Sequence, residues 1–267
     1  MPPLQLIFKS EHMRAALSKA VIESELSSRF GQEIFKLNDR GYAEVISTGL
    51  PEIDALAGGF PRGAITEIFG PDSSGRTSLM LSALAEASNS DEVCALIDTN
   101  DAFDLNSAVN ATVNFDRLLW IRCSGSLEHS FKAVDLLLQG GGFGLVFLDL
   151  GDVHAKEARR IISSWWYRFR RVVENTPTAL VVIAQDACAR SCASLTLALE
   201  SKESDWSTVC DGRLSSVRNL QPVSNNKKLH ADKGSFVSHA NLLRRNLTQV
   251  DRIKPIRAGT CDLHFVT

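Results

Sequence analysis

Short apolar runs alternate with stretches of helical periodicity over most of this 267-residue chain. Strands buried on both faces of a parallel sheet read as continuous apolar runs, and helices connect them. The order therefore predicts an α/β fold with a mostly parallel sheet and helices on both faces. The runs expected to form strands are residues 65–69, 93–97, 118–121, 145–149 and 179–184, and the helices expected between them are 76–87, 104–112, 126–138 and 155–174. Residues 194–199 alternate polar with apolar side chains, which predicts a strand at the edge of the sheet.

Charge divides the chain unevenly. Residues 201–267 hold 11 Lys and Arg against 6 Asp and Glu, whereas the first 200 residues hold 18 against 25. The basic tail is also rich in Ser and Asn and lacks helical periodicity. We therefore expect three parts: an N-terminal helical segment (1–44, with a helix over 10–28), a globular core (45–200) and a basic tail that is at most partly ordered (201–267).

Composition excludes several classes of protein. With 44% hydrophobic and 22% charged residues, the chain is neither mainly disordered nor fibrous. The net charge of -2 gives no global basic field for nucleic acid, and no apolar run reaches the ~20 residues of a membrane span. The first residues lack the charged and apolar regions of a signal peptide, and six cysteines are too few for a disulfide scaffold. The expected location is cytoplasmic, with no membrane partner.

A glycine-rich segment follows the first expected strand and opens the first expected helix. Residues 70–78 fit G-x-x-x-x-G-K-[ST] at every position but one, because Arg76 stands where Lys is expected. Such a loop curls backbone N–H groups around a phosphate at a helix N-terminus, and the Thr77 hydroxyl can bind Mg²⁺. A glycine-rich turn without a ligand is the alternative. The residues predicted to contact phosphates are Gly70, Ser73, Ser74, Gly75, Arg76, Thr77 and Ser78.

Two further observations refine this prediction. Arg76 keeps the positive charge of the usual Lys but is planar and longer, so we expect phosphate binding to survive better than turnover. Asp149 ends an apolar strand, where ligands bind in open α/β sheets, and is a candidate Mg²⁺-supporting carboxylate beside Thr77. The alternative for Asp149 is a turn or helix-capping residue.

Residues 47–75 resemble the opening of the RecA core, with the segments Ser-Thr-Gly-Leu, Gly-Gly-Phe-Pro-Arg-Gly and Ile-Thr-Glu-Ile-Phe-Gly-Pro in the family's order. The resemblance continues through residues 94–98, the strand ending at Asp149, and residues 181–185, and so spans about 45–200. It implies a RecA-like nucleotide-binding core, with ATP and Mg²⁺ as cofactors. It also implies that Gln185 is the glutamine that senses the γ-phosphate.

The chain departs from RecA recombinases at three places. The phosphate loop lacks its Lys, and Asn100 stands where the family has the glutamate that activates water. An amide cannot act as a general base at neutral pH, so no catalytic residue is assigned with Asn100 in that place. Residues 186–194 are also too few for the long DNA-binding loop of a recombinase. These losses predict a RecA-fold protein that does not exchange strands.

Among such relatives, the chain is most similar to the ImuA class of bacterial RecA-like proteins. That resemblance implies an accessory scaffold in SOS-induced mutagenesis and translesion synthesis, with weak or no ATP hydrolysis and with subunits of a DNA polymerase complex as partners. The alternative function is a slow DNA-dependent ATPase that acts on recombinase filaments or in recombination. Single-stranded DNA, a recombinase filament and self-association are further possible partners. A circadian or signalling ATPase is disfavoured, because it would also need the catalytic glutamate that this chain lacks.

Three smaller features have competing interpretations. The helix expected over 155–174 mixes arginines with aromatic residues, which suits single-stranded DNA or, as we prefer, a core helix whose aromatic side chains face the sheet. Cys188 and Cys192 are interpreted as core thiols, since no further pair of metal ligands accompanies them. The tail cations could contact phosphate, contact an acidic partner or remain solvated; they are Lys227, Lys228, Arg244, Arg245, Arg252, Lys254 and Arg257.

Overall fold

The structure is a computed structural model. It describes residues 4–7, 45–158, 161, 163–210, 213–218, 243–254 and 259–266. The helix predicted over residues 10–28 lies outside these ranges.

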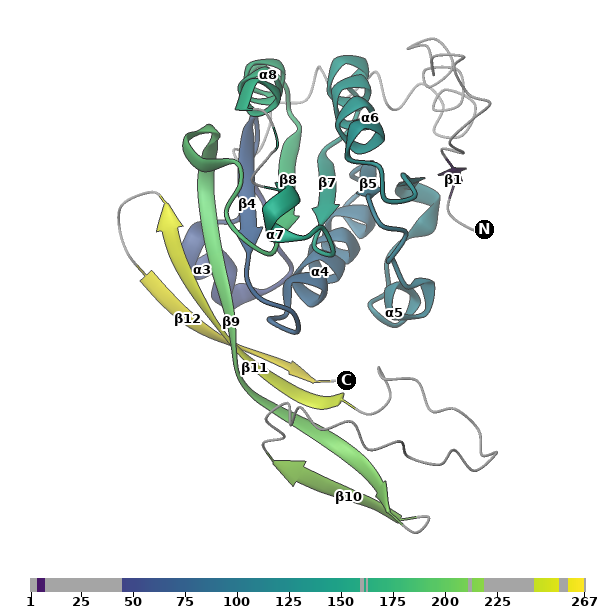
Figure 1. Cartoon of the computed structure of the whole chain (residues 1–267), viewed down its shortest axis with the longest axis vertical. Helices are drawn as coiled ribbons and strands as arrows, with labels where there is room; N and C mark the ends of the chain where they lie inside the picture. Colours follow the sequence, from purple (N-terminus) through teal and green to yellow (C-terminus); the bar gives the residue numbers. More distant parts are fainter. Residues whose placement is uncertain are drawn as a thin grey trace.

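One large sheet organises the molecule (Figure 1). From one edge to the other, its strands are β1 (Leu4–Ile7), β6 (Leu118–Arg122), β5 (Cys94–Asp98), β7 (Leu145–Leu150), β8 (Ala179–Ala184), β4 (Ala64–Phe69), β9 (Ala193–Cys210), β11 (Leu243–Lys254) and β12 (Gly259–Val266), while β10 (Arg213–Arg218) also pairs with β9. Neighbours from β1 to β9 are parallel, and β10, β11 and β12 add antiparallel pairs. A separate antiparallel pair joins β2 (Val45–Ile46) to β3 (Phe60–Pro61). The five predicted central strands are confirmed to within a residue or two at their ends.

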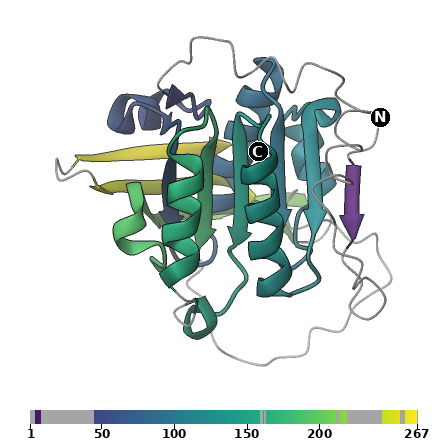
Figure 2. The ribbon, with the colours of Figure 1, turned by 90° about the horizontal axis from the view of Figure 1, so that it is seen from above.

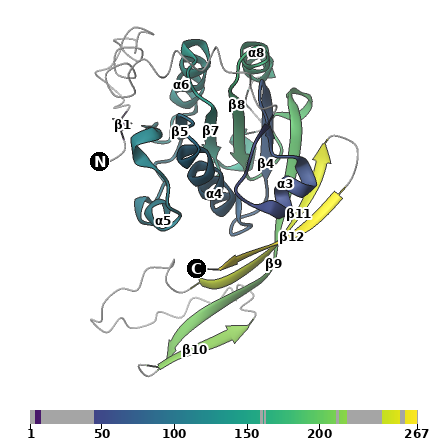
Figure 3. The same ribbon diagram turned by 180° about the vertical axis from the view of Figure 1, so that it is seen from behind.

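Helices cover both faces of the sheet, as Figure 2 and Figure 3 show from above and behind. One face carries α6 (Leu127–Gly140) and α8 (Ser163–Val173), and the other carries α4 (Arg76–Asn89) with α3 (Pro51–Ala57) and α5 (Leu105–Asn110). The short elements are α7 (Ala155–Ala158), η2 (Phe115–Arg117) and η3 (Arg190–Cys192). This arrangement is the predicted α/β fold with a mostly parallel sheet. No helix in the described ranges is long and apolar enough to cross a membrane.

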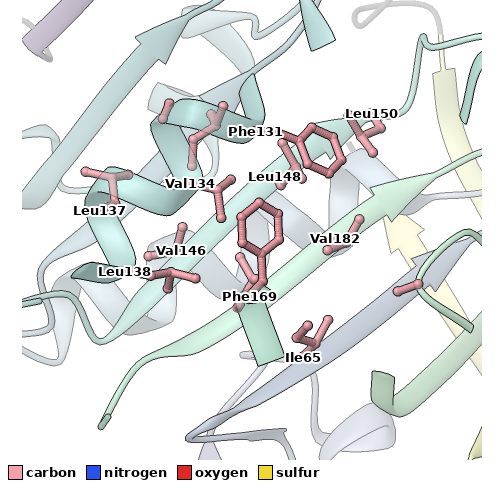
Figure 4. Close-up of a cluster of buried hydrophobic side chains, with 14 of the residues drawn as sticks. Ile65, Phe131, Val134, Leu137, Leu138, Val146, Leu148, Leu150, Phe169 and Val182 are labelled. Atoms are coloured by element: carbon pink, nitrogen blue, oxygen red, sulfur yellow. The ribbon is translucent and has the colours of Figure 1, made fainter. Parts of the chain in front are cut away.

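The core beneath α6 and α8 combines aliphatic side chains with a group of aromatic rings, of which Phe131 and Phe169 are labelled in Figure 4. Phe169 is fully buried, stacks on Phe131 with ring centroids 5.4 Å apart, and touches the rings of Trp165 and Trp166. The interpretation of this segment as a core helix is therefore confirmed for its tryptophans, although Tyr167 remains 56% exposed. The single helix expected over 155–174 is described instead as two elements, α7 and α8.

The arginines of α8 face outward. Arg168 makes a bidentate ion pair with Asp135 of α6, both contacts at 2.6 Å, and Arg170 and Arg171 are exposed. Arg159 and Arg160 lie outside the described residues. Arg168 therefore ties α8 to α6 across the surface, and the described part of the segment has the polar and apolar faces of a packed helix.

The prediction of an edge strand at residues 194–199 is wrong. These residues begin β9, which runs to Cys210 and pairs with β4 on one side and β11 on the other. Their alternation arises because Leu195, Leu197 and Leu199 enter the core on one face while the opposite face is less covered. Alternation thus reports burial of one face and carries no information about hydrogen-bonded neighbours.

The described part of the basic tail belongs to the sheet. The expected boundary near residue 200 falls inside β9, and β11 and β12 form an antiparallel hairpin whose first strand pairs with β9. Val250 and Leu263 bury their side chains in the same core cluster as α3 and α4. The second half of β9 continues with β10 beyond the body of the domain (Figure 1). The division into three parts otherwise stays a prediction.

Candidate functional site

The loop between β4 and α4 has the backbone shape of an anion cradle. Ser73 and Gly75 have positive φ angles of 61° and 90°, so the loop turns sharply before α4 begins. Gly75 is the N-cap of α4, and no side chain among the described residues caps this helix, so its first N–H groups remain as donors for an anion. At Gly70 a Cβ would lie 2.2 Å from the backbone oxygen of Leu199, which restricts this position to glycine.

Three neighbouring strands bring the predicted site residues together. β7, β8 and β4 are adjacent in the sheet, and their carboxyl ends carry Asp149, Gln185 and the phosphate loop. The Arg76 guanidinium, whose side chain is 9% exposed, donates through Nη1 to the Gly151 carbonyl at 3.4 Å and through Nη2 to Asp72 Oδ1 at 3.2 Å. Arg76 therefore connects α4 with the loop that follows Asp149.

Asp149 lies in register with Asp98 of β5, and its Oδ1 accepts a 2.8 Å hydrogen bond from the Gly151 N–H. Burial raises the pKa of Asp149 to about 6, and the nearby Asp98 carboxylate adds to this effect. A carboxyl group that titrates near pH 6 can bind a cation as an anion at neutral pH and releases it when protonated. The role of Asp149 with Thr77 in binding Mg²⁺ stays a prediction.

Asp149 should make folding stability depend on pH. Its pKa of about 6 in the folded protein exceeds the value near 4 in an unfolded chain. Its contribution is therefore fully present below about pH 4 and is lost as pH rises through about 6. We expect the wild-type free energy of unfolding to fall relative to that of Asp149→Asn by about 2–3 kcal/mol between these limits. Urea titrations of both proteins at several pH values test this, and parallel profiles would contradict it.

Asn100 lies at the carboxyl end of β5, in the position considered for the general base. It is exposed, and its Nδ2 donates to the Asp152 carbonyl at 3.1 Å. The nearby Asp98 carboxylate is engaged differently, since it accepts from the N–H groups of Ala102 and Phe103 and from Trp120 Nε1. Asp98 is therefore a structural residue that holds the turn after β5.

The remaining predicted residues occupy different environments. Thr77 and Ser73 are exposed, and Ser78 is half-buried. Ser74 is buried, its hydroxyl has no hydrogen-bond partner among the residues that the structure describes, and a Cβ on Gly70 would come within 2.7 Å of that oxygen. The Ser74 hydroxyl thus faces Gly70 at the start of the loop. The backbone N–H of Ser74 donates to the Pro71 carbonyl. The phosphate contacts of these residues stay predictions.

Sequence reasoning missed the residues that support the loop from the tail. Asn246 of β11 donates through Nδ2 to the Ser73 carbonyl at 3.2 Å. Thr248 and Phe265 pack against Gly75, where a Cβ would lie 2.9 Å from Thr248 Oγ1 and 2.8 Å from Phe265 Cε2. No local signal could have found these contacts, because more than 170 residues separate Ser73 from Asn246.

Two of the tail cations stabilise the domain itself. Arg252 Nη1 donates to the Leu56 carbonyl of α3 at 2.6 Å, and Lys254 Nζ donates to the Arg190 carbonyl at 2.6 Å. These bonds attach the β11–β12 hairpin to the body of the domain. The side chains of the other five tail cations lie outside the described part of the structure.

Cys188 and Cys192 are both buried, as expected for core thiols. Burial raises the pKa of each thiol, and the Glu67 carboxylate raises that of Cys188 further. Across the described ranges, no group of three or more His, Cys, Asp or Glu side chains could hold a metal ion.

The donor set suits a magnesium nucleotide. The uncapped N-terminus of α4, the Arg76 guanidinium and the Gln185 amide supply donors for phosphate, while Thr77 and Asp149 supply oxygens for a cation. A Lewis-acidic Mg²⁺ bound there would neutralise phosphate charge. The residues present therefore fit the cofactors that the loop implies.

Comparisons with known proteins agree with this fold. The family described as "RecA N-terminal domain" matches residues 15–185, and the chain belongs to this family. A protein named Protein RecA from Ectopseudomonas oleovorans is 34% identical over 66% of this chain and 54% of its own length. Proteins of the same name from Desulfotalea psychrophila and Colwellia psychrerythraea are 32% and 33% identical over 61% and 64% of this chain. The chain spans about half the length of these relatives.

Proposed function

We propose that this chain binds ATP with Mg²⁺ at the β4–α4 loop and acts as an accessory protein in bacterial DNA repair. The observation that carries the proposal is the meeting of the phosphate loop, Asp149 and Gln185 at the carboxyl ends of adjacent strands. Arg76 bridges two of these three segments. In this proposal Gly70, Ser73, Ser74, Gly75, Arg76, Thr77, Ser78 and Gln185 bind the phosphates, and Thr77 with Asp149 supports the cation.

We propose that the site binds ATP but hydrolyses it weakly or not at all. Asn100 offers an amide where a general base is needed, and its side chain is held by the Asp152 carbonyl. Arg76 divides its guanidinium between two protein acceptors, so it has fewer donors for a transferring phosphoryl group than a free cation would have. A nucleotide site of this kind gates a binding surface more readily than it drives hydrolysis.

The finer role that we propose is the one implied by the resemblance to the ImuA class. The chain would join a translesion DNA polymerase complex in the cytoplasm during the response to DNA damage. The short segment between β8 and β9, which includes η3, supports this role because it leaves no room for a recombinase's long DNA-binding loop. Direct DNA binding and self-association belong to the alternative, an ATPase that acts on recombinase filaments.

Calorimetric titration with MgATP tests the nucleotide site. We expect the wild type to bind and Thr77→Ala to bind about tenfold more weakly, because the variant loses an oxygen ligand for the cation. Ser90→Ala, at the opposite end of α4, is the matched control and should leave the affinity unchanged. Equal affinity of wild type and Thr77→Ala would remove Thr77 from the site.

A phosphate-release assay with and without single-stranded DNA separates the two functions. The scaffold predicts release below about 0.01 s⁻¹ under both conditions, far under the rates of ordinary enzymes. DNA-stimulated release well above that rate would favour the filament-remodelling ATPase. Co-sedimentation of the MgATP-loaded protein with purified translesion polymerase subunits then tests the partner.

A further inference from the structure

The two donors proposed to hold phosphate share one acceptor inside the protein. Asp72 Oδ1 accepts from Arg76 Nη2 at 3.2 Å and from Gln185 Nε2 at 3.4 Å. Asp72 is the third residue of the phosphate loop, and its side chain is 78% exposed. A carboxylate oxygen that collects both donors has the charge and the hydrogen-bonding role of a phosphate oxygen.

We propose that Asp72 is a built-in competitor for the phosphate group at this site. The inference rests on the proposed nucleotide site and goes beyond it, since it names the residue that sets the site's affinity. Phosphate and the Asp72 carboxylate are both anions and require the same donors, so they repel one another and cannot share them. Entry of phosphate therefore requires Asp72 to release Arg76 and Gln185.

The environment of the two partners makes this exchange feasible. Asp72 is mostly exposed, so its carboxylate can turn into solvent while the buried Arg76 side chain stays in place. Arg76 is held separately, because its other nitrogen, Nη1, donates to the Gly151 carbonyl. A guanidinium can serve both acceptors at once, whereas the single nitrogen of a lysine offers no planar fork for them. The replacement of Lys by Arg thus fits a cation with two acceptors of its own.

The release of Gln185 would carry the signal onward. Gln185 directly follows β8, and the same connection to β9 is anchored where Glu67 accepts the N–H groups of Cys188 and Ala189. A phosphate that displaces Asp72 would draw the Gln185 amide away from the loop between β4 and α4 and toward the phosphate itself. Occupancy of the site then alters the start of this connection while its anchored end stays fixed.

Replacement of Asp72 by asparagine tests the proposal with little change of shape. Asp72→Asn should bind both MgATP and inorganic pyrophosphate about five- to tenfold more tightly than the wild type in calorimetry at low salt, because the competing charge is gone. Asp91→Asn is the matched control. Asp91 is 76% exposed and pairs with Arg117 at 2.9 Å, but it precedes β5 and so lies at the amino ends of the parallel strands, opposite the carboxyl ends that carry the phosphate loop. Its replacement should leave both affinities within twofold.

The outcomes separate this proposal from the proposed function. If the wild type binds MgATP and Asp72→Asn binds no more tightly, the competitor role is wrong while the nucleotide site stands. If neither protein binds either ligand, both proposals are wrong. Tighter binding by Asp91→Asn as well would show a general charge effect and would also overturn the competitor role. Asp72→Ala provides a second variant, for which we expect the same increase in affinity.

Discussion

Replacing Phe169 with alanine is expected to lower the free energy of unfolding by about 3–5 kcal/mol. Phe169 is a fully buried residue of α8 and lies against the rings of Phe131, Trp165 and Trp166. The alanine would leave a cavity lined by aromatic rings and by strands of the sheet, and large flat rings cannot close such a space without moving their helices (Figure 4). Urea unfolding followed by far-ultraviolet circular dichroism measures the loss.

Tyr167 supplies the matched control for this variant. It lies two residues earlier on α8 and is 56% exposed, and its hydroxyl is 3.5 Å from that of Ser191. Tyr167→Ala should lower the free energy of unfolding by less than about 1 kcal/mol, because it removes surface rather than core contacts. Similar losses for both variants would mean that α8 does not pack on the sheet as described.

The central strands were predictable because their physics is local. Each is a mainly apolar run buried on both faces, and the runs over residues 145–149 and 179–184 match β7 and β8 closely. The position of the glycine-rich loop between β4 and α4 was predictable for the same reason, since its glycines lie in one short segment between strand and helix. Asp149 could be proposed because the end of an apolar strand marks the edge where ligands bind.

Contacts between distant segments could not be predicted. The pairing of β9 with β11 and the packing of Thr248 and Phe265 on Gly75 depend on strands separated by long stretches of chain. The tail's polar composition suggested little order, although its strands need only one apolar face to join an antiparallel sheet. Composition alone does not distinguish a disordered polar segment from strands that bury one apolar face.

The acceptor role of Asp72 was hidden for a different reason. An aspartate in a glycine-rich loop reads as a turn residue. Only the structure shows that the side chains of Arg76 and Gln185 both donate to it. The sequence therefore indicated Arg76 and Gln185 as candidate phosphate donors but could not indicate that both already have an anionic partner.

The second large effect is expected at Glu67, a buried carboxylate of β4. One of its oxygens, Oε1, accepts from the N–H groups of Cys188 and Ala189, the latter at 2.6 Å. Glu67→Ala leaves both buried donors without an acceptor and opens a space behind them. We expect the free energy of unfolding to fall by about 2–4 kcal/mol. Urea unfolding measures this loss directly.

Glu67→Gln separates the acceptor from the charge. Its amide oxygen can still accept from the two N–H groups, so we expect less than half of the loss seen in Glu67→Ala. A second measurement reports on the connection itself: Cys188 is buried beside Glu67, and its modification by a thiol reagent, located by mass spectrometry, should accelerate in Glu67→Ala and change little in Glu67→Gln. If the two variants lose equal stability and expose Cys188 equally, charge rather than the shared acceptor holds this segment. If Cys188 in Glu67→Ala reacts with the reagent as slowly as in the wild type, the segment that follows Gln185 is held without Glu67. The anchored end of the connection between β8 and β9 would then lie at another residue.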